Sequence, residues 1–247
     1  LKAVGYSTAF IGKWHMPGNT LPNIAGLDHF ISFTNIGGQG TYEWNPMIVN
    51  GTETPSRTRY IATELTDYAI EWLEQQTSPF VLYLSHKSVH ANFQPDTQDI
   101  GIYKRQQVNL PEGAHVWSAH TKNQYVHLNN APLDESIRRY GEAIHSLDRE
   151  IGRLLASLRS MNLADNTIVI YTSDNGYQWG EHELIDKRWA YETSIRVPFV
   201  VRLPENRYGA TINSSLVANL DVAPTLLDAA GVRVPGYMEG GSLLRLL

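Results

Sequence analysis

The sequence predicts an α/β fold, with a mostly parallel central sheet and helices on both of its faces. Apolar segments of strand length alternate along the chain with segments of helical periodicity, an order typical of α/β domains. The strand segments are continuous apolar runs, which indicates burial on both faces, as in a parallel sheet. Hydrophobic residues make up 42% of the 247 positions, which is enough for a substantial core.

Seven elements follow from this pattern. The predicted strands are TAFIG (8–12), FVLYLS (80–85), TIVIYTS (167–173) and VPFVVRL (197–203). Residues 60–73 and 134–160 place apolar side chains three and four apart, as amphipathic helices do, and Asp134 is a suitable N-cap for the second. A third helix follows Asp221 and ends at Gly231, a typical residue after a helix. The polar, irregular stretch 91–132 predicts a long excursion above the sheet.

The composition excludes several classes of protein. The formal charge is -5, from 20 basic and 25 acidic residues without a basic block, which argues against nucleic acid or an anionic membrane as the main partner. No apolar run has the length needed to cross a bilayer. The chain has no cysteine, which excludes disulfides, thiolate metal sites and a cysteine nucleophile within these residues.

Three polar clusters begin where predicted strands end. Ligands of open α/β sheets bind beyond the carboxyl ends of parallel strands, so these clusters could converge on one site. Lysines with histidines suit an oxyanion such as sulfate or phosphate. An Asp-Asn pair offers hard oxygen ligands, which suit Ca²⁺ or Mg²⁺ rather than zinc. The clusters comprise Lys13, Trp14 and His15; His86, Lys87 and His90; and Asp174, Asn175 and Gly176, followed by GEH (180–182) and Asp186, Lys187 and Arg188.

Each of these residues also has a purely structural interpretation. Lys13 could be a surface lysine at a strand end, and the histidines could be core or loop residues. Asp-Asn-Gly is favourable turn chemistry in any protein. A zinc pair of His86 and His90 would need a helix, whereas this segment follows a strand and precedes a proline. Arg188 could form an ion pair with Asp186 or Glu192.

Several motifs occur in a fixed order along the chain. They are GKWH (12–15), VHANFQP (89–95), the segment 172–204 with DNG, GEH, DKR, YE and SIRVP, and the ending NLDVAPTLLDAAGVRVPGYMEGGSLLRLL. With these motifs the chain resembles the sulfatase family of the alkaline-phosphatase superfamily. It covers nearly the whole chain, and 91–132 contributes least. It implies a sulfuric ester hydrolase acting on a sulfated carbohydrate or a similar alcohol or aryl sulfate. It also implies a protein that is periplasmic, extracellular or lysosomal.

The resemblance implies a role for each matching residue. Lys13 and Lys187 match the sulfate-binding lysines, and His15 matches the histidine that contacts the formylglycine hydrate. His90 matches the histidine near the leaving-group oxygen. Glu181 and His182 either support Lys187 or line the substrate entrance, with His182 as a candidate substrate-binding residue. Asp174 and Asn175 match calcium ligands, and Mg²⁺ is the less favoured ion.

The family nucleophile, a formylglycine made from Cys or Ser in a C/S-x-P-S-R motif, is expected outside this chain. Residues 53–57 reproduce the Pro-Ser-Arg end of that motif, but Glu53 stands where Cys or Ser is required, so we interpret the match as accidental. We expect 1–247 to be an internal portion of one catalytic domain, truncated at both ends and inactive alone. We also expect an open edge on the strand 8–12.

Two other functions remain open at this point. A phosphoesterase or phosphonate hydrolase of the same superfamily would use the same anion-binding logic. A non-catalytic relative could bind sulfated glycans without cleaving them, although binding alone does not require so complete a set of residues.

Overall fold

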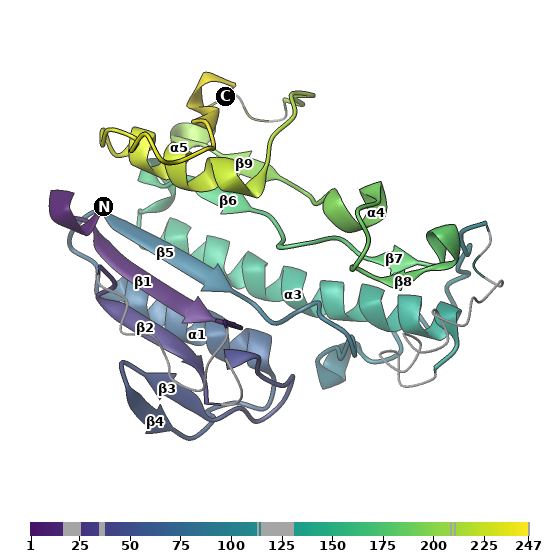
Figure 1. Cartoon of the computed structure of the whole chain (residues 1–247). Coiled ribbons are helices and arrows are strands. Elements are labelled where there is room, and N and C mark those ends of the chain that lie inside the picture. Colours follow the sequence, from purple (N-terminus) through teal and green to yellow (C-terminus); the bar gives the residue numbers. More distant parts are fainter. Residues whose placement is uncertain are drawn as a thin grey trace.

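The computed structural model describes residues 1–16, 26–34, 38–112, 114, 131–207, 209 and 211–246. Its centre is a five-stranded sheet in the order β4-β3-β2-β1-β5 (Figure 1). Of the predicted excursion 91–132, residues 113 and 115–130 lie outside the described part of the chain. The strands of this sheet are β1 (Ser7–Gly12), β2 (His29–Phe33), β3 (Met47–Val49), β4 (Thr52–Thr54) and β5 (Phe80–Ser85).

The main sheet is mixed, with its parallel part around β1. That strand pairs in parallel with β2 on one side and with β5 on the other. The pairs β2–β3 and β3–β4 are antiparallel. The expected open edge on 8–12 is therefore wrong, because β1 has a partner on each side. The α/β class is confirmed, but the antiparallel pairs make the sheet less parallel than expected.

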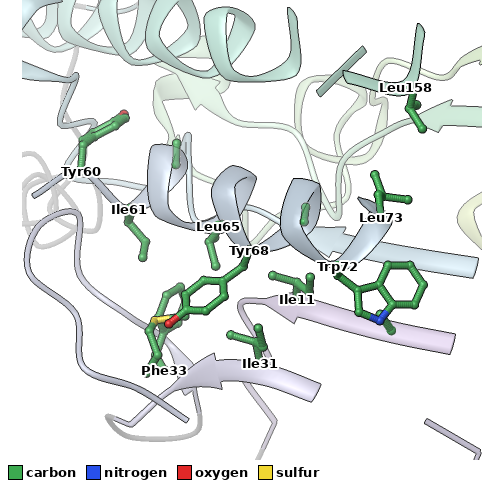
Figure 2. Close-up of a cluster of buried hydrophobic side chains, with 14 of the residues drawn as sticks. Ile11, Ile31, Phe33, Tyr60, Ile61, Leu65, Tyr68, Trp72, Leu73 and Leu158 are labelled. Carbon is green, nitrogen blue, oxygen red and sulfur yellow. The ribbon is translucent and has the colours of Figure 1, made fainter. Parts of the chain in front are cut away.

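Helix α1 (Ile61–Glu74) covers one face of the main sheet. Its apolar side chains recur at helical spacing, so one face of the helix is apolar. Figure 2 shows Ile61, Leu65 and Tyr68 directed toward the strands that carry Ile11, Ile31 and Phe33. Ile11 and Leu65 are both fully buried in this cluster. Burial of apolar surface here stabilises the parallel strands that lead to the site.

The long helix α3 (Leu133–Ser160) joins two hydrophobic clusters. Leu158 near its end packs into the cluster beneath α1, whereas Leu133 packs with Phe93 and Ile185 in a second cluster. Asp134 is not the N-cap, because the helix begins one residue earlier and Pro132 occupies that position. The carboxylate of Asp134 instead binds Arg138 one turn later at 2.7 Å, in the first turn where acidic residues complement the helix dipole.

The opposite face of the sheet carries aromatic side chains and faces α5 (Val222–Ala229). Phe10 stacks on Phe30 and Tyr83 with ring centroids 5.4 Å and 5.3 Å away. A cleft of about 730 Å³ separates this face from α5. Helices on both faces are thus present. The predicted end of the third helix is also confirmed, since Gly231 follows it with φ of 68°.

The two other predicted strands form a separate ribbon. Strands β6 (Val169–Tyr171) and β9 (Val200–Arg202) are shorter than predicted and pair with each other in antiparallel fashion. Val200 is 58% exposed and Tyr83 of β5 is 62% exposed, so the expectation that continuous apolar runs are buried on both faces is wrong for this pair and for β5. A second two-stranded sheet consists of β7 (Gln178–Trp179) and β8 (Ile185–Asp186), which are also antiparallel. Within the described residues, no helix has both the length and the apolar character of a membrane span.

Candidate active site

Lys13 and His15 follow β1 directly, where the strand meets β5. The backbone amide of Lys13 donates to the carbonyl oxygen of Ser85 at 2.8 Å, and Ser85 Oγ donates to the carbonyl of Lys13 at 3.0 Å. Gly12 has φ of 124°, and a Cβ atom on it would lie 1.9 Å from the oxygen of Ser85. Only glycine therefore allows the two strands to approach this closely ahead of Lys13. Figure 1 shows the arrowheads of both strands at the same edge of the sheet.

The segment after β5 carries His90 and is held by two tyrosines, one in the loop between β2 and β3 and one at the N-cap of α1. Tyr42 Oη donates to the carbonyl oxygen of His90 at 2.5 Å, and Tyr60 Oη donates to that of Gln94 at 3.1 Å. His90 Nδ1 lies 2.5 Å from the carbonyl oxygen of Ala91, which can only accept, so Nδ1 carries the proton. The unprotonated nitrogen of the neutral ring is consequently Nε2.

The remaining candidates lie between β6 and α4 (Glu192–Ile195). Gly176 closes the turn that begins with Asp174 and Asn175, and its amide donates to the carbonyl of Ser194 at 2.7 Å. A Cβ atom on Gly176 would lie 2.1 Å from the carbonyl oxygen of Thr193, so this turn requires glycine. Lys187 comes directly after β8, at the base of the β7–β8 hairpin.

Electrostatic interactions show that these segments converge. Burial lowers the pKa of Lys13, Asp174 raises it, and the ammonium of Lys187 lowers it further. Burial and then the charges of Lys13 and Lys187 lower the pKa of His15, with Asp174 opposing them. The structure therefore brings together side chains from three distant parts of the sequence, as the positions of the polar clusters predict.

The charges of the lysine cluster also act on His90. The pKa of His90 is lowered to about 4, mainly by burial, with the charges of Lys187 and Lys13 adding to the effect and the Ala91 carbonyl opposing it. At neutral pH the ring is uncharged, with Nε2 as an acceptor. An anion beside the lysines would offset their charge and raise the pKa of His90.

Asp174 and Asn175 offer oxygen atoms suited to a hard cation. Asp174 accepts two hydrogen bonds through Oδ1, and the side-chain Nδ2 of Asn175 donates to the carbonyl oxygen of Gly176 at 2.7 Å. In the described part of the chain, Asp174 Oδ2 and Asn175 Oδ1 accept no hydrogen bond. These two oxygens fit Ca²⁺, which binds six to eight oxygen ligands, so they would form part of a site. No group of three or more His, Cys, Asp or Glu side chains suited to a metal occurs among the described residues.

Other candidates lie outside this cluster or have structural partners. The ring of His182 stacks on Tyr191 at 3.8 Å, and among the described residues it is not one of the charges that shift the cluster's pKa values. Glu181 accepts from the amide of Trp179 at 2.6 Å and so fixes the hairpin. Of the two ion-pair partners proposed for Arg188, the structure has Asp186, at 2.8 Å.

The Pro-Ser-Arg match at 55–57 lies between the edge strand β4 and helix α1. Ser56 Oγ donates to Glu64 at 2.7 Å, and Arg57 forms an ion pair with Glu71 at 2.7 Å, both on α1. These partners give both side chains a structural role. The interpretation of the match as accidental agrees with this placement.

Comparisons with known proteins identify the family. The sequence model of the sulfatase family matches residues 1–232. The chain belongs to the sulfatase family. The N-acetylglucosamine-6-O-sulfatase of Bacteroides thetaiotaomicron is 27% identical over 317 residues, which cover 100% of this chain and 56% of the relative. An extracellular sulfatase of Drosophila melanogaster is 39% identical over 107 residues, covering 43% of this chain and 10% of its own length.

A solved structure has the same fold. A protein in complex with its substrate D-glucosamine-2-N,6-O-disulfate superposes with a TM-score of 0.82 and 26% identity, covering 100% of this chain and 63% of that one. This sulfatase chain spans 56% of the length of the Bacteroides relative and 63% of the chain in the solved structure.

Proposed function

We propose that this chain forms the sulfate-recognising part of a sulfatase that hydrolyses a sulfate ester of a glycan. The observation that carries the proposal is the convergence of Lys13 and Lys187 with two histidines and Asp174, described above by their mutual effects on pKa. A cluster of lysines beside neutral histidines attracts an anion that retains its charge at all physiological pH values, as a sulfate ester does.

The two lysines bind the non-bridging oxygens of the sulfate group. Both project from segments that directly follow strands, and Lys13 is fixed by backbone hydrogen bonds to Ser85. Charged donors held in a partly buried site interact more strongly with an oxyanion than they would in water, because the local dielectric constant is lower. They stabilise the additional negative charge that develops as the ester bond breaks.

His90 protonates the leaving-group oxygen. With Nδ1–H held by the Ala91 carbonyl, the proton to be transferred resides on Nε2 of the doubly protonated ring. The bound sulfate group raises the pKa of His90 by offsetting the charge of the neighbouring lysines, so the acid forms when the substrate is bound. His15 lies among the same charges and, by the family resemblance, would contact the formylglycine hydrate.

Sulfatases generally use a metal ion and a formylglycine. When bound, the metal offsets charge on the sulfate group, and the formylglycine supplies the nucleophile. In this chain Asp174 and Asn175 would contribute oxygen ligands to Ca²⁺, with Mg²⁺ as the less suitable ion. The formylglycine would come from outside residues 1–247.

The proposed substrate is a sulfated amino sugar or a related sulfated glycan. Support comes from the B. thetaiotaomicron relative, whose name specifies N-acetylglucosamine 6-O-sulfate, and from the structural neighbour with a sulfated glucosamine. His182 and Tyr191 form an exposed aromatic pair, suited to contact a sugar ring. A periplasmic, extracellular or lysosomal location stays a prediction, supported by the extracellular Drosophila relative.

The experiment is a calorimetric titration of the 247-residue chain with glucosamine 6-sulfate, glucosamine 6-phosphate and glucosamine. We expect binding of the sulfated sugar, no binding of glucosamine, and a loss of about tenfold in affinity for Lys187→Met. The matched control is Lys104→Met, which removes the same charge from an exposed lysine outside the cluster. Equal affinity for the sulfated and unsulfated sugars would contradict the proposal, and a preference for the phosphate would favour a phosphoesterase.

A further inference from the structure

Lys87 is a buried lysine for which the described residues provide no acidic partner. Its side chain is only 7% exposed, and in the described part of the chain no carboxylate forms an ion pair with it. The partners of its ammonium group are weak. Nζ lies 3.4 Å from the carbonyl oxygen of Gln39 and 5.7 Å from the centre of the Tyr42 ring. Burial of a charge with so little compensation is costly, so it indicates a ligand.

The location of Lys87 places this charge in the candidate site. The register pairs Gly12 with Ser85, so Lys13 and Lys87 both emerge just beyond the ends of neighbouring parallel strands. Tyr42 holds the same segment twice, through its hydroxyl on the His90 carbonyl and through its ring beneath Lys87. Tyr42 therefore anchors the segment that carries Lys87.

The neighbours of Lys87 add positive charge. Its pKa is lowered to about 8, mainly by burial and in addition by the ammonium groups of Lys13 and Lys187. Three lysines that repel one another in a partly buried site are stabilised when an anion binds among them. Two of the three are those that the proposed function assigns to sulfate.

We propose that Lys87 is a third anion-binding lysine, which contacts a sulfate-group oxygen together with Lys13 and Lys187. The proposal rests on the proposed function, because it takes the sulfate group to lie at this cluster. The sequence motif that includes His90 does not require it: Lys87 is the first charged residue after β5, and its partners Gln39 and Tyr42 come from a distant loop.

The test is a titration of the 247-residue chain with sodium sulfate at constant ionic strength, kept constant with sodium chloride. Variants with a lysine replaced by methionine retain most of the apolar stem and remove the charge. We expect Lys87→Met to weaken sulfate binding about tenfold or more, and Lys104→Met to stay within about twofold of the unmodified chain. Because Lys87→Met removes a poorly compensated buried charge, its melting temperature should not fall.

Two results separate this proposal from the proposed function. If Lys13→Met and Lys187→Met weaken sulfate binding while Lys87→Met does not, the third lysine is refuted and the proposed function stands. If none of the three variants weakens binding, both fail. A fall in melting temperature for Lys87→Met would instead indicate a structural role and overturn the assignment.

A measurement on the unmodified chain does not depend on how the variants fold. The side-chain NMR signals of Lys87 should shift during the sulfate titration and saturate at the same concentration as those of Lys13. A Lys87 signal that stays in place while that of Lys13 moves would overturn the proposal.

Discussion

Replacement of Gly12 by alanine should damage the fold at the point where the site begins. The new Cβ atom would lie 1.9 Å from the carbonyl oxygen of Ser85, whereas ordinary contacts begin at about 3.4 Å. Strands β1 and β5 would have to separate, which breaks the hydrogen bond from Lys13 to Ser85. The residue would also retain φ of 124°, a conformation that side chains rarely adopt.

The size of the effect follows from these three costs. Overpacking contributes about 1–3 kcal/mol, the backbone conformation about 1–3 kcal/mol and the hydrogen bond about 1 kcal/mol. We expect Gly12→Ala to lower the free energy of unfolding by about 3–7 kcal/mol, a large part of what a typical domain possesses. Urea unfolding followed by tryptophan fluorescence measures this change.

A second glycine provides the control. Gly152 lies in the interior of α3, and a Cβ atom on it would meet nothing within 4 Å. Gly152→Ala should raise the free energy of unfolding by roughly 0.5–1 kcal/mol, because alanine favours the helix. A loss of less than about 1 kcal/mol for Gly12→Ala would refute the reasoning, since the strands would then tolerate a side chain between them.

Three further predictions concern single residues. In an enzyme that contains this chain, His90→Ala should lower kcat/KM about 100-fold for a sugar sulfate but much less for a nitrophenyl sulfate, whose leaving group needs no proton; equal losses would exclude the acid role. Asp174→Ala should weaken calcium binding more than Asn175→Ala does, because it removes a charged ligand. Calorimetric titration with Ca²⁺ measures both affinities, and an equal or larger loss for Asn175→Ala would contradict the prediction. Burial lowers the pKa of His86 from 6.5 to about 4, so between these pH values the unfolded chain binds more protons than the folded chain. The free energy of unfolding should therefore fall as the pH drops from 6.5 to about 4, and it should fall less steeply in the His86→Phe variant. Urea titrations at several pH values measure this difference.

The sequence predicts elements whose signal is local. The three long helices have apolar residues at regular spacing, and α1, α3 and α5 begin within a residue or two of their predicted positions. The strands 8–12 and 80–85 are also found almost unchanged, as β1 and β5. Regular patterns within one segment are sufficient for such predictions.

The missed elements depend on distant partners or on turns. Strands β3 and β4 are three residues each and are joined by Asn50-Gly51, a two-residue hairpin signal that the short flanking segments obscure. The antiparallel pairing of β6 with β9 cannot be read from their apolar runs, because the same composition suits either direction. The pairing becomes evident only when both strands are seen outside the main sheet.

The candidate site shows the same division. Lys13, Asp174 and Lys187 were predicted because each follows a strand within a recognisable motif. Lys87 also follows a strand, but its burial depends on Gln39 and Tyr42, which come from a loop more than forty residues earlier. Burial of a single lysine has no local signature, so the structure was needed to distinguish it from a surface residue.

The parallel pairing of β1 with β5 has a consequence for the order of folding. It joins Ser7 to Phe80, so the lysines at the ends of these strands meet only after the chain closes a loop of roughly seventy residues. Such non-local contacts form late, whereas the β3–β4 hairpin can form within about 1–10 μs. An anion held by Lys13 and Lys87 therefore has nothing to bind in early intermediates. In stopped-flow experiments sulfate should slow unfolding and leave the rate of folding unchanged.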